Sequence, residues 1–251
     1  MTYLGFHLTF ILGPTVVLTA VALRSRARLG PRTPAALFAV APLALLYTAR
    51  WDQYLIANRV WWYGEDRVVG SWLGVPYEEY AFMMLQPVLT GALLLALLSL
   101  RSAPLVRPST SWHGRRAGAA AGSALILTGL GAGAWALRNG GGWTYLGLIL
   151  VWALPALGGL VVASWPGLRA FWRESLLTWA VATTYLGVAD GIAIASGVWT
   201  ISPEQSTGWL VFGLPFEEAL FFAVTNGLVV AGAMLFWVPG LPPAGDGIRS
   251  E

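Results

Sequence analysis

The hydrophobic positions of this chain fall into seven long apolar runs separated by short polar segments. The runs cover residues 3 to 23, 34 to 57, 76 to 100, 117 to 137, 143 to 164, 175 to 198 and 209 to 238. About 20 apolar residues are enough for a helix that crosses the roughly 30 Å hydrocarbon core of a bilayer. The pattern therefore predicts an all-α integral membrane protein of about seven transmembrane helices.

Composition agrees with a membrane protein and narrows the possible chemistry. Hydrophobic residues make up 57% of the 251 residues and charged residues 11%, whereas a soluble domain carries roughly a quarter charged residues. The sequence contains neither Cys nor Lys, which excludes a thiolate nucleophile, a lysine Schiff base and a phosphate-binding lysine. Its two His residues are too few for an imidazole metal site, so we expect no metal.

Arginines supply all 15 positive charges, and most of them lie in the first, third and fifth loops between the apolar runs. Cytoplasmic loops of membrane proteins carry an excess of Arg and Lys. We therefore expect these loops and the C-terminus on the cytoplasmic side, with the N-terminus outside. The residues concerned are Arg24, Arg26, Arg28, Arg32, Arg101, Arg107, Arg115, Arg116, Arg169 and Arg173.

Five landmarks recur in the same order along the chain, at offsets between 138 and 142 residues. This predicts two three-helix repeats, residues 1–100 and 141–238, joined by a linking helix in 101–140 and followed by a flexible tail, 239–251. The second repeat begins four helices after the first, and an even number of crossings gives both repeats the same orientation in the membrane. The landmarks are Tyr3-Leu4-Gly5 with Tyr145-Leu146-Gly147, Pro14 with Pro155, Tyr47 and Asp52 with Tyr185 and Asp190, Trp61 with Trp199, and Gly74 to Glu79 with Gly213 to Glu218.

The linking segment is unusually rich in glycine within an apolar run. No strand pattern precedes it, which argues against a dinucleotide-binding loop. Glycines allow helices to approach closely in membranes, so we expect this helix to pack tightly against a neighbour. The glycines are Gly118, Gly122, Gly129, Gly131 and Gly133.

Each repeat carries a Pro-x-Glu-Glu motif at the start of a very apolar run. Glu217 and Glu218 stand in an otherwise uncharged stretch from 207 to 238, and an acid inside the membrane costs roughly 2.5 kcal/mol or more. Pro215 suits the first turn of a helix, where the helix dipole favours a carboxylate. No Arg, Lys or His occurs between residues 174 and 248. Unless a cation of the first repeat reaches these acids and Asp190, we expect one to keep its proton near neutral pH, as a general acid requires.

The first repeat differs because Arg50, Arg59 and Arg67 lie near its acids in the sequence. We therefore expect the two motifs to titrate differently, one serving better as acid and the other as base. Asp52 and Glu78 lie near predicted helix ends, where an alternative role as solvated helix caps stays open.

Aromatic residues gather around both motifs. Ring faces attract cations, so an apolar pocket that holds a protonated acid, a carboxylate and aromatic walls suits carbocation chemistry on a lipid-soluble alkene. The alternative is an aromatic belt at the membrane interface. The residues expected to contact a substrate are Trp61, Trp62, Tyr80, Phe82, Trp199, Phe216 and Phe221.

The duplicated motif resembles that of the carotenoid-type lycopene cyclase domain family, in its fused two-repeat form. It stands here as Pro76-Tyr77-Glu78-Glu79-Tyr80 and Pro215-Phe216-Glu217-Glu218-Ala219, with Ala219 in place of the first repeat's Tyr80. The resemblance implies a lycopene β-cyclase of a bacterial or archaeal cytoplasmic membrane, which isomerises an end of lycopene to a β-ionone ring without redox change or cofactor.

The resemblance also implies roles for the acids. Glu78, Glu79, Glu217 and Glu218 would supply the acid and the base, with Asp52 and Asp190 as proton relays or hydrogen-bonding partners. On this basis, Glu78→Gln or Glu217→Gln is predicted to abolish turnover without preventing membrane insertion.

Three alternatives remain open on the sequence alone. Related enzymes cyclise longer carotenoids or hydrate the terminal alkene, and small-solute transporters also consist of parallel repeats with acids in the membrane. A homo-oligomer is also left open.

Overall fold

The computed structural model describes residues 1–109 and 111–243, so residues 244–251 of the expected tail lie outside the described part. Seven helical spans in the described residues are long and apolar enough to cross a membrane, which confirms the all-α membrane fold. The spans are Tyr3–Arg24, Thr33–Ala57, Tyr77–Ser99, Trp112–Asn139, Gly141–Ala170, Trp172–Ala195 and Phe216–Gly240.

Several spans are built from consecutive helical segments. The first consists of α1 (Tyr3–Phe6), the π-helical η1 (His7–Leu12) and α2 (Gly13–Arg24), followed by the short α3 (Arg26–Leu29). The second consists of α4 (Thr33–Phe38) and α5 (Val40–Ala57). The others are α6 (Tyr77–Ser99), α7 (Trp112–Asn139), η2 (Gly141–Trp143) with α8 (Thr144–Ala170), α9 (Trp172–Ala195), and α10 (Phe216–Trp237) with η3 (Val238–Gly240).

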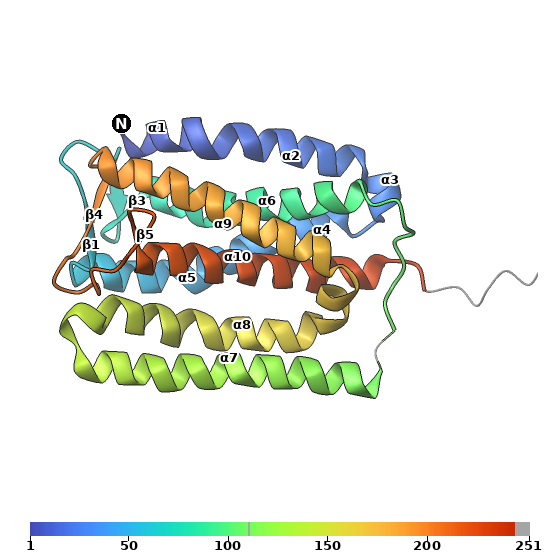
Figure 1. The fold of residues 1–251 in the computed structure, drawn as a ribbon. Helices are drawn as coiled ribbons and strands as arrows, with labels where there is room; N and C mark the ends of the chain where they lie inside the picture. Colours follow the sequence, from blue (N-terminus) through green and yellow to red (C-terminus); the bar gives the residue numbers. More distant parts are fainter. Residues whose placement is uncertain (110, 244–251) are drawn as a thin grey trace, which may run out of the picture.

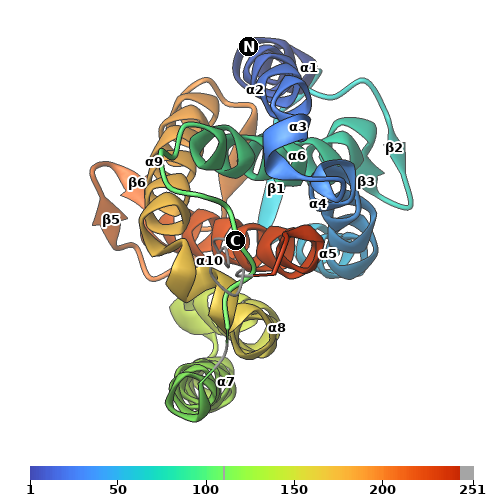
Figure 2. The same ribbon diagram turned by 90° about the vertical axis from the view of Figure 1, so that its right-hand side faces the viewer.

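The two helices that begin with the Pro-x-Glu-Glu motifs, α6 and α10, are the most buried spans. They lie in the middle of the bundle, with α1 and α2 on one side and α8 and α7 on the other (Figures 1 and 2). Pro76 and Pro215 are the residues immediately before these helices, so both glutamates of each motif lie in the first helical turn. Both prolines are the N-caps of these helices, one position before the predicted first turn, where a missing N–H also costs no hydrogen bond within the helix.

Helix α7 lies at the outer edge of the bundle and packs along α8 (Figure 2). A Cβ atom at Gly122 would lie 2.5 Å from the carbonyl oxygen of Gly158, and one at Gly133 would lie 2.5 Å from Val151. Gly118 and Gly129 are similarly close to α8, whereas Gly131 has open space around it. The prediction that these glycines serve close helix packing is confirmed for all but Gly131.

Short strands at one end of the bundle were not predicted. Strands β2 (Ser71–Trp72) and β3 (Val75–Pro76) form a hairpin before α6, and β5 (Leu210–Val211) and β6 (Leu214–Pro215) form one before α10. The predicted run from 209 thus merges a hairpin with the helix that begins at Phe216. Apolar content alone cannot separate a two-residue strand from the start of a helix.

The hairpin turns explain why a glycine stands two residues before the proline of each Pro-x-Glu-Glu motif. Leu73 and Gly74 have φ values of 52° and 81°, and Phe212 and Gly213 have 51° and 87°. Positive φ at both central residues is the signature of a type I′ turn, which matches the twist of the flanking strands. Glycine adopts this conformation without steric cost.

A third strand pair joins the two halves of the chain. Strand β1 (Trp61–Tyr63) pairs antiparallel with β4 (Trp199–Ile201), with Trp61 opposite Ile201 and Tyr63 opposite Trp199. This pair lies at the same end of the bundle as the hairpins (Figure 1). The chain segments that follow α5 and α9 are therefore tied together beside the first turns of α6 and α10.

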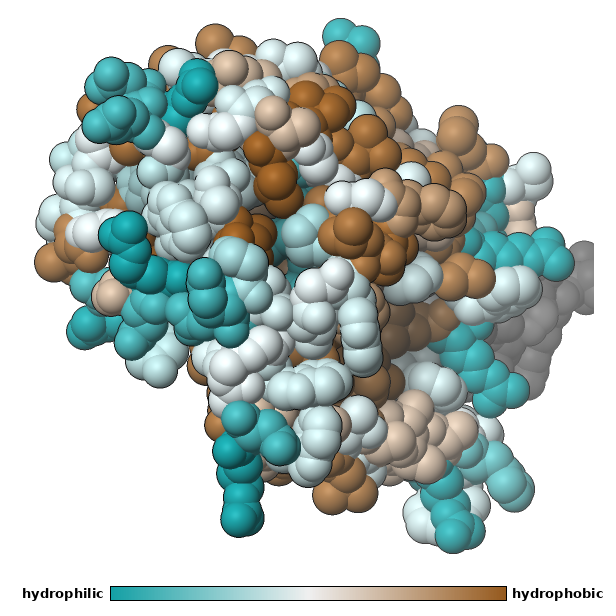
Figure 3. Space-filling model, turned by 60° about the vertical axis from the view of Figure 1, so that its left-hand side comes forward, coloured by the Kyte–Doolittle hydropathy of each residue, from teal (hydrophilic) through white to brown (hydrophobic). Residues whose placement is uncertain are grey.

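The outer faces of the helices carry large apolar side chains. Leu46, Leu127 and Val188 are examples that are more than half exposed, and Figure 3 shows apolar residues over the body of the molecule with hydrophilic ones gathered toward its ends. Extensive exposed apolar surface is unusual in a soluble monomer. It is the surface that a lipid bilayer requires.

Candidate active site

The first glutamate of each motif is directed toward the loop before its own helix. Oε1 of Glu78 accepts a hydrogen bond of 2.8 Å from the backbone N–H of Val69, and Oε1 of Glu217 accepts one of 2.7 Å from Thr207. Both side chains are buried. The two glutamates therefore hold equivalent loops, and neither lines the central cavity that is described below.

The second glutamate of each motif points in a different direction, because successive residues of a helix are about 100° apart. Oε2 of Glu79 accepts hydrogen bonds from the hydroxyls of Tyr3 at 2.8 Å and Tyr63 at 2.7 Å. Oε1 of Glu218 accepts one from the hydroxyl of Tyr145 at 2.7 Å. The recurrence of Tyr3 as Tyr145 was visible in the sequence and is the signal that could have assigned these tyrosines to the site.

Tyr63 has no tyrosine counterpart in the second repeat. The position equivalent to Tyr63 is Ile201, the third residue of strand β4. Burial, together with the nearby Glu79 and Asp52, raises the pKa of the Tyr63 phenol well above its usual range. Tyr63 is therefore a neutral hydrogen-bond donor to Glu79.

The two aspartates are buried inside helices α5 and α9, with 2% and 1% of their surface exposed. The carboxyl groups of Asp52 and Glu79 are neighbours that line the same small cavity, and two adjacent buried carboxyl groups repel each other unless one of them keeps its proton. Oδ1 of Asp190 accepts a hydrogen bond of 2.9 Å from the indole N–H of Trp199. Neither Asp52 nor Glu78 is a solvated cap, because both are almost fully buried.

Four of the six predicted acids converge on one small cavity. Asp52, Glu79, Asp190 and Glu218 all line a space of about 50 Å³ between the two halves of the chain. We call this space the carboxyl chamber. Its remaining walls are Trp61, Phe82, Tyr145, Trp199, Ile201, Phe221 and Phe222.

Four of the seven predicted aromatic residues line the chamber, and three lie elsewhere. The three are held by other partners: the ring of Trp62 lies 5.5 Å from the Arg59 guanidinium, the Tyr80 hydroxyl donates to the Trp72 carbonyl, and Phe216 packs on Trp209. The residues that do line the chamber are Trp61, Phe82, Trp199 and Phe221.

The arginines near the first motif in sequence do not contact its acids. Arg50 donates to Gln53, Arg59 covers Trp62, and Arg67 donates to the carbonyl of Met1. Within residues 1–109 and 111–243, the salt bridge found is that of Arg101 with Glu174, at the other end of the bundle. The sequence neighbourhood of these arginines was therefore misleading, and the chamber acids have no cationic partner among the described residues.

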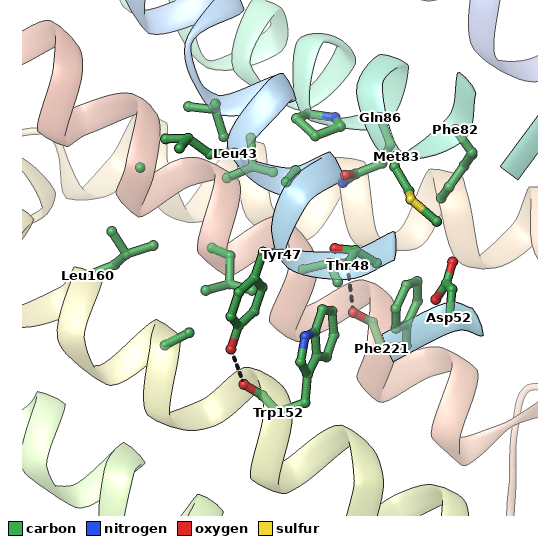
Figure 4. Close-up of a pocket in the computed structure, with 18 of the residues that line it drawn as sticks. Leu43, Tyr47, Thr48, Asp52, Phe82, Met83, Gln86, Trp152, Leu160 and Phe221 are labelled. Atoms are coloured by element: carbon green, nitrogen blue, oxygen red, sulfur yellow. Dashed lines mark hydrogen bonds between the residues drawn. The ribbon is translucent and has the colours of Figure 1, made fainter. Parts of the chain in front are cut away.

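The chamber opens into a larger apolar groove of about 370 Å³. Asp52, Glu79, Phe82 and Phe221 border both spaces. The groove follows α5 from Asp52 to Val40, which corresponds to roughly 20 Å at 1.5 Å per residue. Figure 4 shows Tyr47, Thr48 and Trp152 facing it from α5 and α8, and its other lining residues include Leu43, Met83, Leu160, Leu228 and Gly232.

Trp51 and Trp152 form part of the aromatic wall beside the groove and were not assigned to the site from the sequence. Their rings stack at 4.1 Å, and Phe221 lies parallel to Trp51 at 5.9 Å. The Tyr47 hydroxyl donates a hydrogen bond of 2.6 Å to the Trp152 carbonyl. These contacts place flat aromatic faces next to the carboxyl groups.

A buried polar cluster fixes the two motif helices against each other. The side-chain oxygen of Asn226 on α10 accepts hydrogen bonds from Gln86 at 2.8 Å and Thr90 at 2.7 Å, both on α6. In the apolar interior of a membrane protein, such interhelical hydrogen bonds hold helices in register. The spacing of Glu79 and Glu218 across the chamber depends on this register.

The arrangement suits proton transfer to and from an apolar molecule. Oδ1 of Asp52 and Oδ2 of Asp190 are buried and have no hydrogen-bond partner among the described residues. An unpaired buried carboxyl oxygen is costly unless the site uses it. An apolar chain lying in the groove would have its end beside these groups and the aromatic walls of the chamber.

Comparison with known proteins agrees with this geometry. The family model described as lycopene cyclase matches residues 2–97 and 142–236. The lycopene beta-cyclase of Halobacterium salinarum (strain R1) is 39% identical over 239 residues, which cover 92% of this chain and 96% of the relative.

Fungal relatives are longer proteins. The bifunctional lycopene cyclase/phytoene synthases of Leptosphaeria maculans and Podospora anserina are 34% and 33% identical, over 93% of this chain in each case. The chain spans 41% and 40% of their lengths. No solved structure matches.

Proposed function

The chain belongs to the lycopene cyclase family, and on this premise we propose that it is a lycopene β-cyclase, which closes an end of a linear carotenoid into a β-ionone ring. The observation that carries the proposal is the chamber of four buried carboxyl groups at the end of an apolar groove, where no cation of residues 1–109 and 111–243 pairs with them. A carotenoid is apolar along its length and reacts at its end, so it needs a site of this shape.

The reaction is an isomerisation in which one proton is gained and another is lost. The proton shared by Asp52 and Glu79 is added to the terminal double bond, and the neighbouring double bond attacks the resulting cation to form the ring. A carboxylate then removes a ring proton and leaves the ring double bond. We assign this step to Glu218, which accepts only one hydrogen bond from a tyrosine and faces the chamber from the opposite helix. Formula and oxidation state do not change, and the reaction requires no cofactor.

The aromatic walls have two effects on the cation. The faces of Trp61, Phe82, Trp199 and Phe221 attract positive charge. They also enclose a chamber of only about 50 Å³, from which a bound end group would displace water. Water would capture the cation as an alcohol, so the small chamber favours cyclisation over hydration.

Glu78 and Glu217 have a positioning role in this proposal. Each accepts a backbone hydrogen bond from the loop before its helix, and those loops include the hairpins that precede α6 and α10. Asp190 holds Trp199 through its hydrogen bond and acts as a partner of Glu218.

We also propose the membrane arrangement and repeat division expected from the sequence. The units are residues 1–100, 101–140 and 141–238, and the arginine-rich loops lie on the cytoplasmic side. The contacts of Arg28 with the carbonyl of Arg101 and of Arg101 with Glu174 support this, because they gather these loops at the end away from the chamber. The N-terminus then lies outside. A homo-oligomer stays a prediction.

The experiment is to supply lycopene to the purified protein in liposomes prepared in D₂O. We expect a cyclic carotenoid that carries one deuteron for each ring formed, because the added proton comes from an exchangeable carboxyl group. Conversion without deuterium would contradict the acid-base mechanism, and a lack of any cyclic product would contradict the function.

A further inference from the structure

The two halves of the chain approach the carboxyl chamber through equivalent helix pairs. In one pair, the Tyr47 hydroxyl on α5 donates to the Trp152 carbonyl on α8 at 2.6 Å. In the other, the Tyr185 hydroxyl on α9 donates to the Phe10 carbonyl in η1 at 2.8 Å. Tyr47 and Tyr185 are repeat landmarks, and Phe10 precedes Trp152 by the same 142 residues that separate Tyr3 from Tyr145. The fold thus offers two related routes to the chamber.

Within the residues that the structure describes, the route beside α5 is open and the equivalent route beside α9 is filled by side chains. The open route is the apolar groove described above, between α5, α6, α8 and α10. At the equivalent place beside α9, Leu186 stands where the open side has Thr48, and Phe222 stands where it has Met83. Leu186 and Phe222 are buried in one hydrophobic cluster with Phe6, Ile11 and Leu89.

The helix packing differs in the same way. Helix α9 packs closely against α6, whereas its counterpart α5 makes little contact with α10. The groove occupies the space between α5 and α10, and Val40 and Gly232 line it from the two helices. Larger side chains on the α9 side thus replace the substrate space with protein core.

We propose that the protein holds one carotenoid end at a time and cyclises a two-ended substrate in separate binding events, releasing the monocyclic carotenoid between them. The inference rests on the proposed function. All four chamber acids share one small space of about 50 Å³, which leaves no room for two end groups at once. The rest of the carotenoid lies along the groove beside α5, so its second end reaches the acids only after the molecule has left and returned in the reversed orientation.

The order in which products appear tests this inference. The purified full-length protein is placed in phosphatidylcholine liposomes with lycopene in large molar excess, and carotenoids are separated at early times. We expect a monocyclic carotenoid as the first or sole product, and any bicyclic product after a lag that lengthens with more lycopene. Bicyclic product without a lag, in a ratio to monocyclic product that is independent of lycopene, would overturn the inference while leaving the proposed function intact. Absence of every cyclic product would overturn both.

A substitution tests the single route directly. Thr48→Leu places in the open groove the residue that fills the closed side. We expect both cyclisation steps to slow by the same factor, because both ends use this groove. The factor should be at least about 10-fold, which is typical of one added steric obstruction in an apolar pocket. The control is Leu46→Ile, on the exposed outer face of α5, which should retain the original rates. Unchanged rates in Thr48→Leu, or slowing of only one step, would overturn the inference, and size-exclusion elution checks that the variant is folded.

Discussion

The two halves of this protein share their landmarks but present different surroundings to their acids. In the first half, Glu79 accepts hydrogen bonds from two tyrosines, is a neighbour of Asp52 and borders the open groove. In the second half, Glu218 accepts one tyrosine hydrogen bond, and its neighbour Asp190 is held by Trp199 behind a packed core.

This difference shows how a duplicated unit yields an asymmetric site. An acid-base reaction needs one group that gives a proton and another that takes one. Two identical halves would offer the same group twice. In the proposed mechanism, substitutions at a few positions, such as Tyr63 against Ile201 and Thr48 against Leu186, give the halves separate tasks.

The largest effect is expected from removing the chamber glutamates. Glu79→Gln and Glu218→Gln should each lower the rate of cyclisation by about 100- to 10,000-fold, because each removes a group that transfers a proton. Glutamine has nearly the same volume, so folding should be retained. The check is the initial rate of cyclic carotenoid formation in liposomes, at equal amounts of inserted protein. Activity near that of the unmodified protein in either variant would contradict its assigned role.

The aspartates compare the halves directly. Asp52→Asn should lower the rate by at least about 100-fold, since it removes a member of the pair that shares the donated proton. Asp190→Asn should have a smaller effect, because Asn can still accept the hydrogen bond from Trp199. The check is to measure the initial rates of cyclic carotenoid formation by the two variants under the same conditions. Equal losses would mean that the two halves are functionally equivalent.

Tyr63 tests the feature found in one half alone. Tyr63→Phe removes one of the two tyrosine hydrogen bonds to Glu79, and a hydrogen bond of this kind contributes about 1 kcal/mol. We therefore expect a rate roughly 5-fold lower. Tyr54→Phe, at an exposed position on α5, is the matched control and should not change the rate. A loss as severe as that of Glu79→Gln would give Tyr63 a direct part in proton transfer.

The smallest effect is expected at the glutamates that hold loops. The sequence alone predicts that Glu78→Gln or Glu217→Gln abolishes turnover. Their placement predicts rates within a few-fold of normal, because a glutamine carbonyl can still accept the backbone hydrogen bond. Glu78→Ala should instead lower the free energy of unfolding by about 1 kcal/mol, since it removes the hydrogen bond that the backbone N–H of Val69 donates. Rates and thermal unfolding of the three variants distinguish the two expectations.

Much of the fold followed from local patterns in the sequence. Seven apolar runs became seven helical spans, because helix length and apolar character alone decide whether a segment suits a bilayer. The glycines of α7 indicated close packing for a similar reason, since the lack of a side chain is a local property. The landmarks also identified Asp52 and Asp190 as paired acids, whereas the burial of Asp52 became clear only from the structure.

The sequence left undetermined the features that depend on the direction of a side chain and on the distance between elements. It could not show that Glu79 faces the chamber while Glu78 faces a loop, because the rotation of α6 is set by its packing against the rest of the bundle. The sequence suggested that Arg50, Arg59 and Arg67 lie near the acids of the first repeat. In the structure they contact other groups, because side chains close in sequence can point away from each other.

The sequence also could not reveal the pairing of β1 with β4, which joins segments 138 residues apart. The sequence by itself determined that buried acids exist in an apolar membrane protein. The tertiary structure decided which of them meet and from which side a substrate reaches them, because both depend on how large and small side chains fill the space between helices.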